Sequence, residues 1–307
     1  MRRRYFALTI SMLAVAAPIA AHATAIYPYA FASDQITNLQ VENSDTGELV
    51  SIPLNSGSQE AISDSAQYDG YGISGYQGSG AINSALSIPQ AFSGPLSSTP
   101  PASFTAVGPG NMIGARADAV IGALVAPGPG VMGGSSVSNV AEAYGNALGS
   151  SSAANVAYIN FTFSGAGYPL DIIFQETTEL VATTAGASSG FLGESASASA
   201  LNALVLNGSN GTSFSAFPFG INGQVAVSSS NGTGSSPYSS SGTYSIVTPR
   251  LDNGVTYTLS LQSSVTETIQ AGSAVPEPPL GLLFGLGALG LWSFVRLTNK
   301  SRHQAKI

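Results

Sequence analysis

Apolar and polar residues alternate with a period of two along several segments, and this pattern limits the fold more than any other feature. Val255, Tyr257, Leu259 and Leu261 fall on one side of residues 255–265, and Thr, Ser and Gln fall on the other. Residues 154–163 repeat the pattern, with Ala157, Ile159, Phe161 and Phe163 on the apolar side. Successive side chains of a β-strand point to opposite faces, so each segment predicts a strand with one buried face.

Further segments fit the same architecture. Residues 168–182 are longer and contain the adjacent pair Ile172 and Ile173, which predicts a strand buried on both faces. Residues 223–229 and 243–249 are shorter candidates. Asn-Gly pairs, which tolerate the positive φ of type I′ hairpin turns, recur in the second half of the chain, at Asn207, Asn210, Asn222, Asn231 and Asn253. Short strands between such turns indicate an antiparallel sandwich or barrel.

Alanine alternates with other residues at 115–119, 141–143 and 196–200. On a strand this gives one small apolar face, which allows two sheets to approach closely. An alanine-rich helix is the alternative, and the neighbouring Gly, Ser and Thr argue against it. The sequence therefore predicts an all-β fold, an antiparallel β-sandwich with its core over 115–270. Residues 31–110, interrupted by Gly and Pro, are predicted to be rich in loops.

Charge is divided between the ends and the body of the chain. Between residues 26 and 274, Arg116 and Arg250 are the only basic residues against fifteen acids, a net charge of −13. This stretch has no Lys or His, and the chain has no Cys. Ser-His-Asp, Cys-His and Schiff-base catalysis and His/Cys zinc sites are thereby excluded from the body. Nucleic-acid binding lacks the cations it needs, whereas carboxylate chemistry and oxygen-ligand metals remain.

The first 25 residues have the layout of a signal peptide. Residues 2–4 are basic, residues 7–20 are mostly apolar, and small residues follow. The apolar run is short and contains Pro18, so cleavage after Ala23 or Ala25 is favoured over a permanent membrane anchor. Sec export is favoured over twin-arginine export because the twin-arginine match is partial.

Residues 275–307 combine an apolar segment with a basic tail. The uncharged run 280–295 is about 24 Å long as a helix at about 1.5 Å per residue, against a bilayer core of roughly 30 Å. A transmembrane helix over 280–297 becomes possible if Arg296 extends to the interface. The tail 298–307 then lies in the cytoplasm by the positive-inside rule, and the body lies across the membrane. The residues that set this topology are Arg296, Lys300, Arg302 and Lys306.

This C-terminal arrangement resembles the PEP-CTERM sorting signal of Gram-negative bacteria. The motif is Val275-Pro276-Glu277-Pro278, followed by the apolar span and the basic tail. The resemblance implies recognition of Pro276, Glu277 and Pro278 by exosortase, a membrane transpeptidase, and delivery to the cell surface or the exopolysaccharide matrix. Pro279 stands where a small polar residue is usual, and the basic residues are dispersed. A GPI signal lacks the basic tail, and an unprocessed single-pass anchor is the simpler alternative. The strands of about 115–269 also resemble the β-rich ectodomains of such proteins, a likeness that carries over no catalytic residue.

The body offers a few candidate sites. Two groups of acids could supply oxygen ligands for calcium. They are Glu42, Asp45 and Glu48, and Asp64 with Asp69. Their spacing fits no EF-hand, and the alternative is that they are solvated surface acids.

A glycosidase pair is a second candidate site, formed from Asp171, Glu176 and Glu179. Strand geometry, however, points Asp171 away from Glu176. The rings of Tyr68, Tyr71 and Tyr76 either face a polysaccharide or line turns. Arg116 and Arg250 are predicted to pair with nearby acids.

The sequence thus predicts a signal peptide at 1–25, a β-rich exported domain at 26–274 and a PEP-CTERM segment at 275–307. Such a chain is expected to be a non-enzymatic surface or matrix protein without a cofactor, calcium being a weak alternative. Its precursor would sit in the inner membrane facing the periplasm and reach the cell surface or exterior through exosortase, in association with exopolysaccharide or a biofilm. A carbohydrate-binding or adhesive module is the alternative, and a carboxylate-dependent glycoside hydrolase is a remote one.

Overall fold

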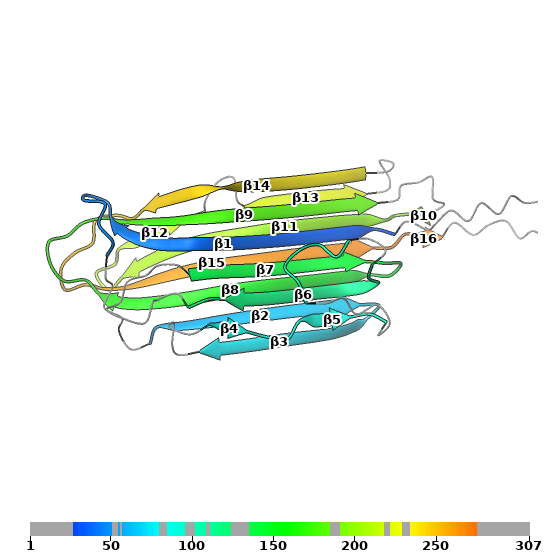
Figure 1. Ribbon diagram of the computed structural model, residues 1–307, viewed down its shortest axis with the longest axis horizontal. Helices are drawn as coiled ribbons and strands as arrows, with labels where there is room; N and C mark the ends of the chain where they lie inside the picture. The colour runs from blue at the N-terminus through cyan, green and yellow to red at the C-terminus, as the bar shows by residue number, and fades with distance from the viewer. Residues whose placement is uncertain are drawn as a thin grey trace, which may run out of the picture.

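The protein is seen in a computed structural model that describes residues 27–50, 55, 57–79, 85–95, 102–108, 111–123, 135–184, 191–217, 222–228 and 234–274. These residues form two seven-stranded antiparallel sheets that pack face to face as a β-sandwich, with the strands along the long axis (Figure 1). The predicted sandwich is therefore confirmed. A short additional pair joins β10 (Phe191–Leu192) to β16 (Ser273–Ala274).

The first sheet has the strand order β14-β9-β1-β7-β6-β4, with β5 also paired to β6. Its strands are β1 (Tyr29–Asn43), β4 (Leu86–Ser87), β5 (Ala91–Ser93), β6 (Gly114–Ile121), β7 (Ser135–Tyr144), β9 (Leu170–Thr184) and β14 (Gly234–Val247). The second sheet has the order β12-β11-β15-β8-β2-β3, with β13 also paired to β11. Its strands are β2 (Gln59–Tyr68), β3 (Tyr71–Ser79), β8 (Gly149–Thr162), β11 (Ser195–Gly208), β12 (Ser213–Ala216), β13 (Gly223–Ser228) and β15 (Thr256–Gln270).

The strands predicted from alternation lie at the centre of the second sheet. β8 and β15 are hydrogen-bonded neighbours, and most of their inward residues, among them Ile159 and Tyr257, are fully buried, whereas Leu261 is half-buried. The prediction for 168–182 is wrong in one respect, since β9 buries only one face. Ile172 is fully buried, whereas Ile173 on the other face is half-buried and Gln175 is exposed. The outer face of the first sheet is open at this strand, so an adjacent pair of isoleucines did not require two covered faces.

All three alanine-alternating segments are strands, in β6, β7 and β11. Their alanines face the inter-sheet core, as predicted, and each buries little area, so each stabilises the fold weakly at roughly 25 cal/mol per Å². The core accordingly consists of many small contacts across both sheets.

Residues 31–110, predicted to be rich in loops, contribute the long strands β1, β2 and β3. β1 lies in the middle of the first sheet, between β9 and β7, so the sandwich begins well before residue 115. The sequence signal was weak because β1 is irregular. A register shift between Ile36 and Leu39, with Asn38 at a φ of 54°, breaks its alternation.

The tightest hairpin turn is not at an Asn-Gly pair. Asp69 and Gly70, with φ of 52° and 81°, connect the paired residues Tyr68 and Tyr71 of β2 and β3, as a two-residue type I′ turn requires. Asn210-Gly211 does lie in a turn, between β11 and β12. Asn207, in contrast, is within β11 and is paired on both sides.

The two ends of the described chain lie at the same pole of the sandwich. β1 starts and β16 ends at the right side of Figure 1. The described residues include no helix long and apolar enough to cross a membrane. The predicted signal peptide at 1–25, the motif at 275–278, the helix at 280–297 and the tail at 298–307 lie outside the described residues.

Candidate functional site

The acids considered for calcium are separated by the fold. Asp45 lies in an exposed turn after β1 and pairs with Arg250, with 2.9 Å between Oδ2 and Nη2. Asp64 is buried on β2, where its carboxylate accepts hydrogen bonds from the backbone N–H groups of Gly75 at 2.9 Å and Ala91 at 3.1 Å. Asp69 belongs to the β2–β3 turn. Within the described residues, no three Asp, Glu, His or Cys side chains gather as a metal site requires.

The acids of β9 do not form a pair. Asp171 and Glu179 lie on the outer face of the first sheet, and Glu176 lies on the inner face at 2% exposure. A glycosidase needs two carboxyl groups on either side of one sugar bond. The opposite orientation of Asp171 and Glu176 predicted from strand geometry is confirmed.

The three candidate tyrosines have different environments. Tyr68 is buried and its hydroxyl donates to Asn146 Oδ1 at 3.1 Å. Tyr71 and Tyr76 are 79% and 74% exposed on β3, which is the edge strand of the second sheet. Tyr71 is opposite the inward-facing Tyr68 in the β2–β3 register, whereas Tyr76 is opposite the outward-facing Ser63. The two exposed rings therefore point to different faces of the strand and do not share a platform.

Arg116 anchors a loop on the outer face of the first sheet. It is fully buried beside the equally buried Glu142 of β7, with 2.7 Å between Nη2 and Oε2. Its Nη1 and Nη2 groups also donate to the carbonyl oxygens of Ser103 and Thr105, each at 2.6 Å. Burial, followed by the charge of Glu142, raises the pKa of Tyr29, whose hydroxyl donates to that carboxylate at 2.9 Å. The predicted pairing of Arg116 and Arg250 with acids is confirmed.

The same carboxylate also holds the next part of that loop. Glu142 accepts the backbone N–H groups of Val107 at 3.1 Å and Gly108 at 2.9 Å. Below the loop lies a small second core, formed by Tyr29, Phe31, Met112, Val140 and Tyr144. A buried pair with all these partners is satisfied, so its role is structural.

A polar layer runs between the two sheets, and sequence reasoning missed it. At its centre are two buried carboxyl groups, Asp34 of β1 and Glu176 of β9, which share hydrogen bonds with Thr178. Burial raises the pKa of both groups, and for Glu176 the nearby Asp34 raises it further. The pair therefore retains a proton between its two carboxyl groups. A signal for Glu176 was present, because it shares its strand face with Phe174 and Leu180.

Side chains of the second sheet, together with Asn139 of the first, complete this layer. Ser263 of β15 donates to Asp34 Oδ2 at 2.6 Å, and Asn202 of β11 donates to Glu176 Oε1 at 2.8 Å. Asn139 of β7 donates to the Ser263 hydroxyl at 2.7 Å and accepts from Asn155 of β8 at 2.6 Å. Six strands, β1, β7, β8, β9, β11 and β15, thus contribute to one hydrogen-bonded network across the sandwich.

Two more acids lie on the inner face of the second sheet. Glu267 accepts a hydrogen bond from Ser151 at 2.6 Å, and burial raises its pKa well above the ordinary range. Glu60 is 1% exposed, and burial raises its pKa to about 7. Neither oxygen of Glu60 has a hydrogen-bond partner within the described part of the chain. These groups favour the protonated form in the folded protein.

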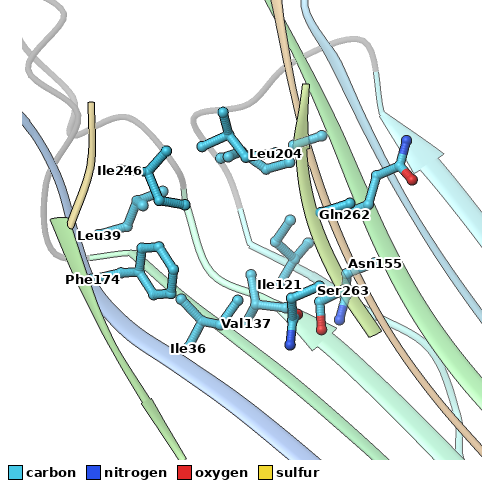
Figure 2. A pocket seen from close by; sticks show the side chains of 14 residues that line it. Ile36, Leu39, Ile121, Val137, Asn155, Phe174, Leu204, Ile246, Gln262 and Ser263 are labelled. Atoms are coloured by element: carbon cyan, nitrogen blue, oxygen red, sulfur yellow. The ribbon is translucent and has the colours of Figure 1, made fainter. Parts of the chain in front are cut away.

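A cavity of about 50 Å³ adjoins the polar layer (Figure 2). Most of its wall is aliphatic or aromatic and comes from both sheets, whereas Asn155, Asn202 and Ser263 contribute its polar part.

Comparison with known protein families, characterised proteins and solved structures finds no match to the chain. The class that the described residues define is a β-sandwich with a polar layer between its sheets.

Proposed function

We propose that this chain is an exported, non-enzymatic protein of the cell surface or extracellular matrix, sorted by an exosortase through a PEP-CTERM tail and associated with exopolysaccharide. The tail motif is the observation that carries the proposal. Val275-Pro276-Glu277-Pro278 begins directly after β16, where the β-sandwich ends, and it precedes the apolar segment and the basic tail.

The placement of the chain ends supports this proposal. Both ends of the described chain lie at one pole, so a C-terminal membrane tether would leave the opposite pole free to face outward (Figure 1). The composition supports it too, since the acidic body has no Lys or Cys and depends on neither a disulfide nor a redox state.

Cell fractionation tests the sorting step. The triple variant Pro276→Ala, Glu277→Ala, Pro278→Ala is expected to remain in the inner membrane, whereas the wild type reaches the cell surface or medium. Pro249→Ala, at an exposed position outside the motif, is the control and should fractionate like the wild type. Unchanged fractionation of the triple variant would contradict exosortase sorting.

A carbohydrate-binding or adhesive module is the second candidate, and the exposure of Tyr71 and Tyr76 favours it. Aromatic rings supply apolar faces on which sugars can lie. A glycan array with wild type, Tyr71→Ala and Tyr76→Ala tests this function. Binding that falls in either variant would support it, and the absence of any binding by the wild type would exclude it for the glycans on the array.

The remote hydrolase hypothesis has less support, because β9 directs Glu176 away from Asp171 and Glu179. Incubation with a panel of polysaccharides between about pH 4 and pH 8 tests it directly. Release of reducing ends that is lost in Glu176→Gln would revive the hypothesis.

A further inference from the structure

The cavity beside the polar layer has an apolar wall. Ile36, Leu39 and Phe174 contribute from the first sheet and Leu204 contributes from the second (Figure 2). Leu261 of the second sheet also lines the cavity. Its volume of about 50 Å³ exceeds what one water molecule needs, which is of the order of 10–15 Å³. Water gains few hydrogen bonds against aliphatic side chains, so most of this surface favours an apolar occupant.

The polar part of the cavity offers unused hydrogen-bond acceptors. Asn155 and Asn202 line it and are only 4% and 3% exposed. Each uses its amide nitrogen elsewhere, Asn155 toward Asn139 and Asn202 toward Glu176. Within the described residues, Oδ1 of both asparagines therefore has no donor. Buried acceptors are nearly always satisfied, so these two oxygens indicate a ligand group that donates hydrogen bonds.

Negative charge lies close behind these oxygens. Ser263, which lines the cavity, donates a 2.6 Å hydrogen bond to Oδ2 of Asp34, and the Asp34–Glu176 pair keeps one negative charge when its two carboxyl groups hold a single proton. The basic side chains of the described residues lie elsewhere. Arg116 is on the outer face with Glu142, and Arg250 is on the surface with Asp45. A cation in the cavity would thus meet favourable charge without competition from a neighbouring basic residue in this part of the chain.

We propose that the cavity binds a small organic cation, a primary ammonium group on a short aliphatic body. The ammonium group would donate hydrogen bonds to Oδ1 of Asn155 and Asn202, and the aliphatic body would lie against the apolar wall. A bare metal ion fits less well, because an aliphatic wall supplies it with no ligands. A sugar has more hydroxyl groups than these two acceptors can satisfy. This inference concerns the interior of the sandwich and is independent of the sorting of the chain.

Isothermal titration calorimetry with methylammonium chloride tests the proposal, using the full-length purified protein near pH 7 and at constant ionic strength. A cavity of about 50 Å³ admits only a very small cation, because a cavity of about 150 Å³ holds one benzene molecule. Methanol is the matched neutral probe, since it keeps the methyl group and lacks the charge. We expect saturable binding of methylammonium and at least tenfold weaker binding of methanol. Equal affinity for the two probes would overturn the proposal, as would no binding of methylammonium.

Variants distinguish the cavity from general attraction to an acidic surface. Asn202→Leu and Asn155→Leu remove the acceptors at similar volume, and each should weaken methylammonium binding at least tenfold. Ala157→Leu fills the cavity from its wall without touching the acceptors, and it should abolish binding even if the asparagine variants fail to fold. Asn210→Leu, at an exposed turn, is the control and should bind like the wild type. Retention of wild-type affinity in Ala157→Leu would refute the site.

Discussion

Glu60 is expected to make the protein less stable as the pH rises. It lies on the inner face of β2 at 1% exposure, and its carboxylate oxygens have no hydrogen-bond partner among the described residues. Burial raises its pKa from the ordinary 4.5 to about 7. Below about pH 4.5 the group is protonated in both the folded and the unfolded chain. As the pH rises through 7, the unfolded chain has already lost the proton that the folded chain still binds, so stability falls.

The size of the effect follows from the difference between the two pKa values. At about 1.4 kcal/mol for each pH unit, the rise from 4.5 to about 7 corresponds to a loss of about 3 kcal/mol by pH 8. Glu60→Gln keeps the shape of the side chain and cannot ionise. We therefore expect this variant to match the wild type near pH 4 and to exceed its free energy of unfolding by about 3 kcal/mol at pH 8.

Urea denaturation at a series of pH values measures this difference. Glu48→Gln, at an exposed position, is the control. A Glu60→Gln effect that is the same at pH 4 and pH 8 would show that the folded protein does not hold this proton. A variant less stable than the wild type at pH 8 would refute the argument altogether.

Other substitutions test the loop anchor, the hairpin and the edge strand. Arg116→Met should lower the free energy of unfolding by about 3–5 kcal/mol, since it leaves buried Glu142 uncompensated, and adding Glu142→Gln should restore part of the loss in urea denaturation. Gly70→Ala should cost about 1–2 kcal/mol through its φ of 81° alone, because an added Cβ meets no atom within 4 Å; an unchanged melting temperature would contradict this. Tyr71→Ala should change stability by less than about 0.5 kcal/mol, and a larger loss on thermal unfolding would show that the ring packs against the fold.

The polar layer shows where reasoning from sequence reached its limit. Alternation places Glu176 on the same side of β9 as Phe174 and Leu180, so its burial could have been predicted. Its pairing with Asp34 could not. The two residues are far apart in the chain, and they meet only because β1 and β9 pair in a register that sets Asp34 opposite Thr178.

The exclusion of Lys and His from the body had a consequence that appears only in the folded protein. It ruled out many catalytic groups from composition alone. It also means that Asp34, Glu60, Glu176 and Glu267 are buried between sheets without a basic partner among the described residues, and burial raises the pKa of each. Protonation and hydrogen bonds to Ser, Thr and Asn replace ion pairs in this core.

By itself, the sequence determined which side chains face inward and which chemistries the body lacks, because a strand's alternation is set by local covalent geometry and composition needs no fold. The tertiary structure decided which inward residues meet. It joined Arg116 to Glu142 across β6 and β7, placed Asp34 beside Glu176, and left a cavity next to Asn155 and Asn202. Such contacts depend on strand order and register, which arise from packing between segments distant in the chain.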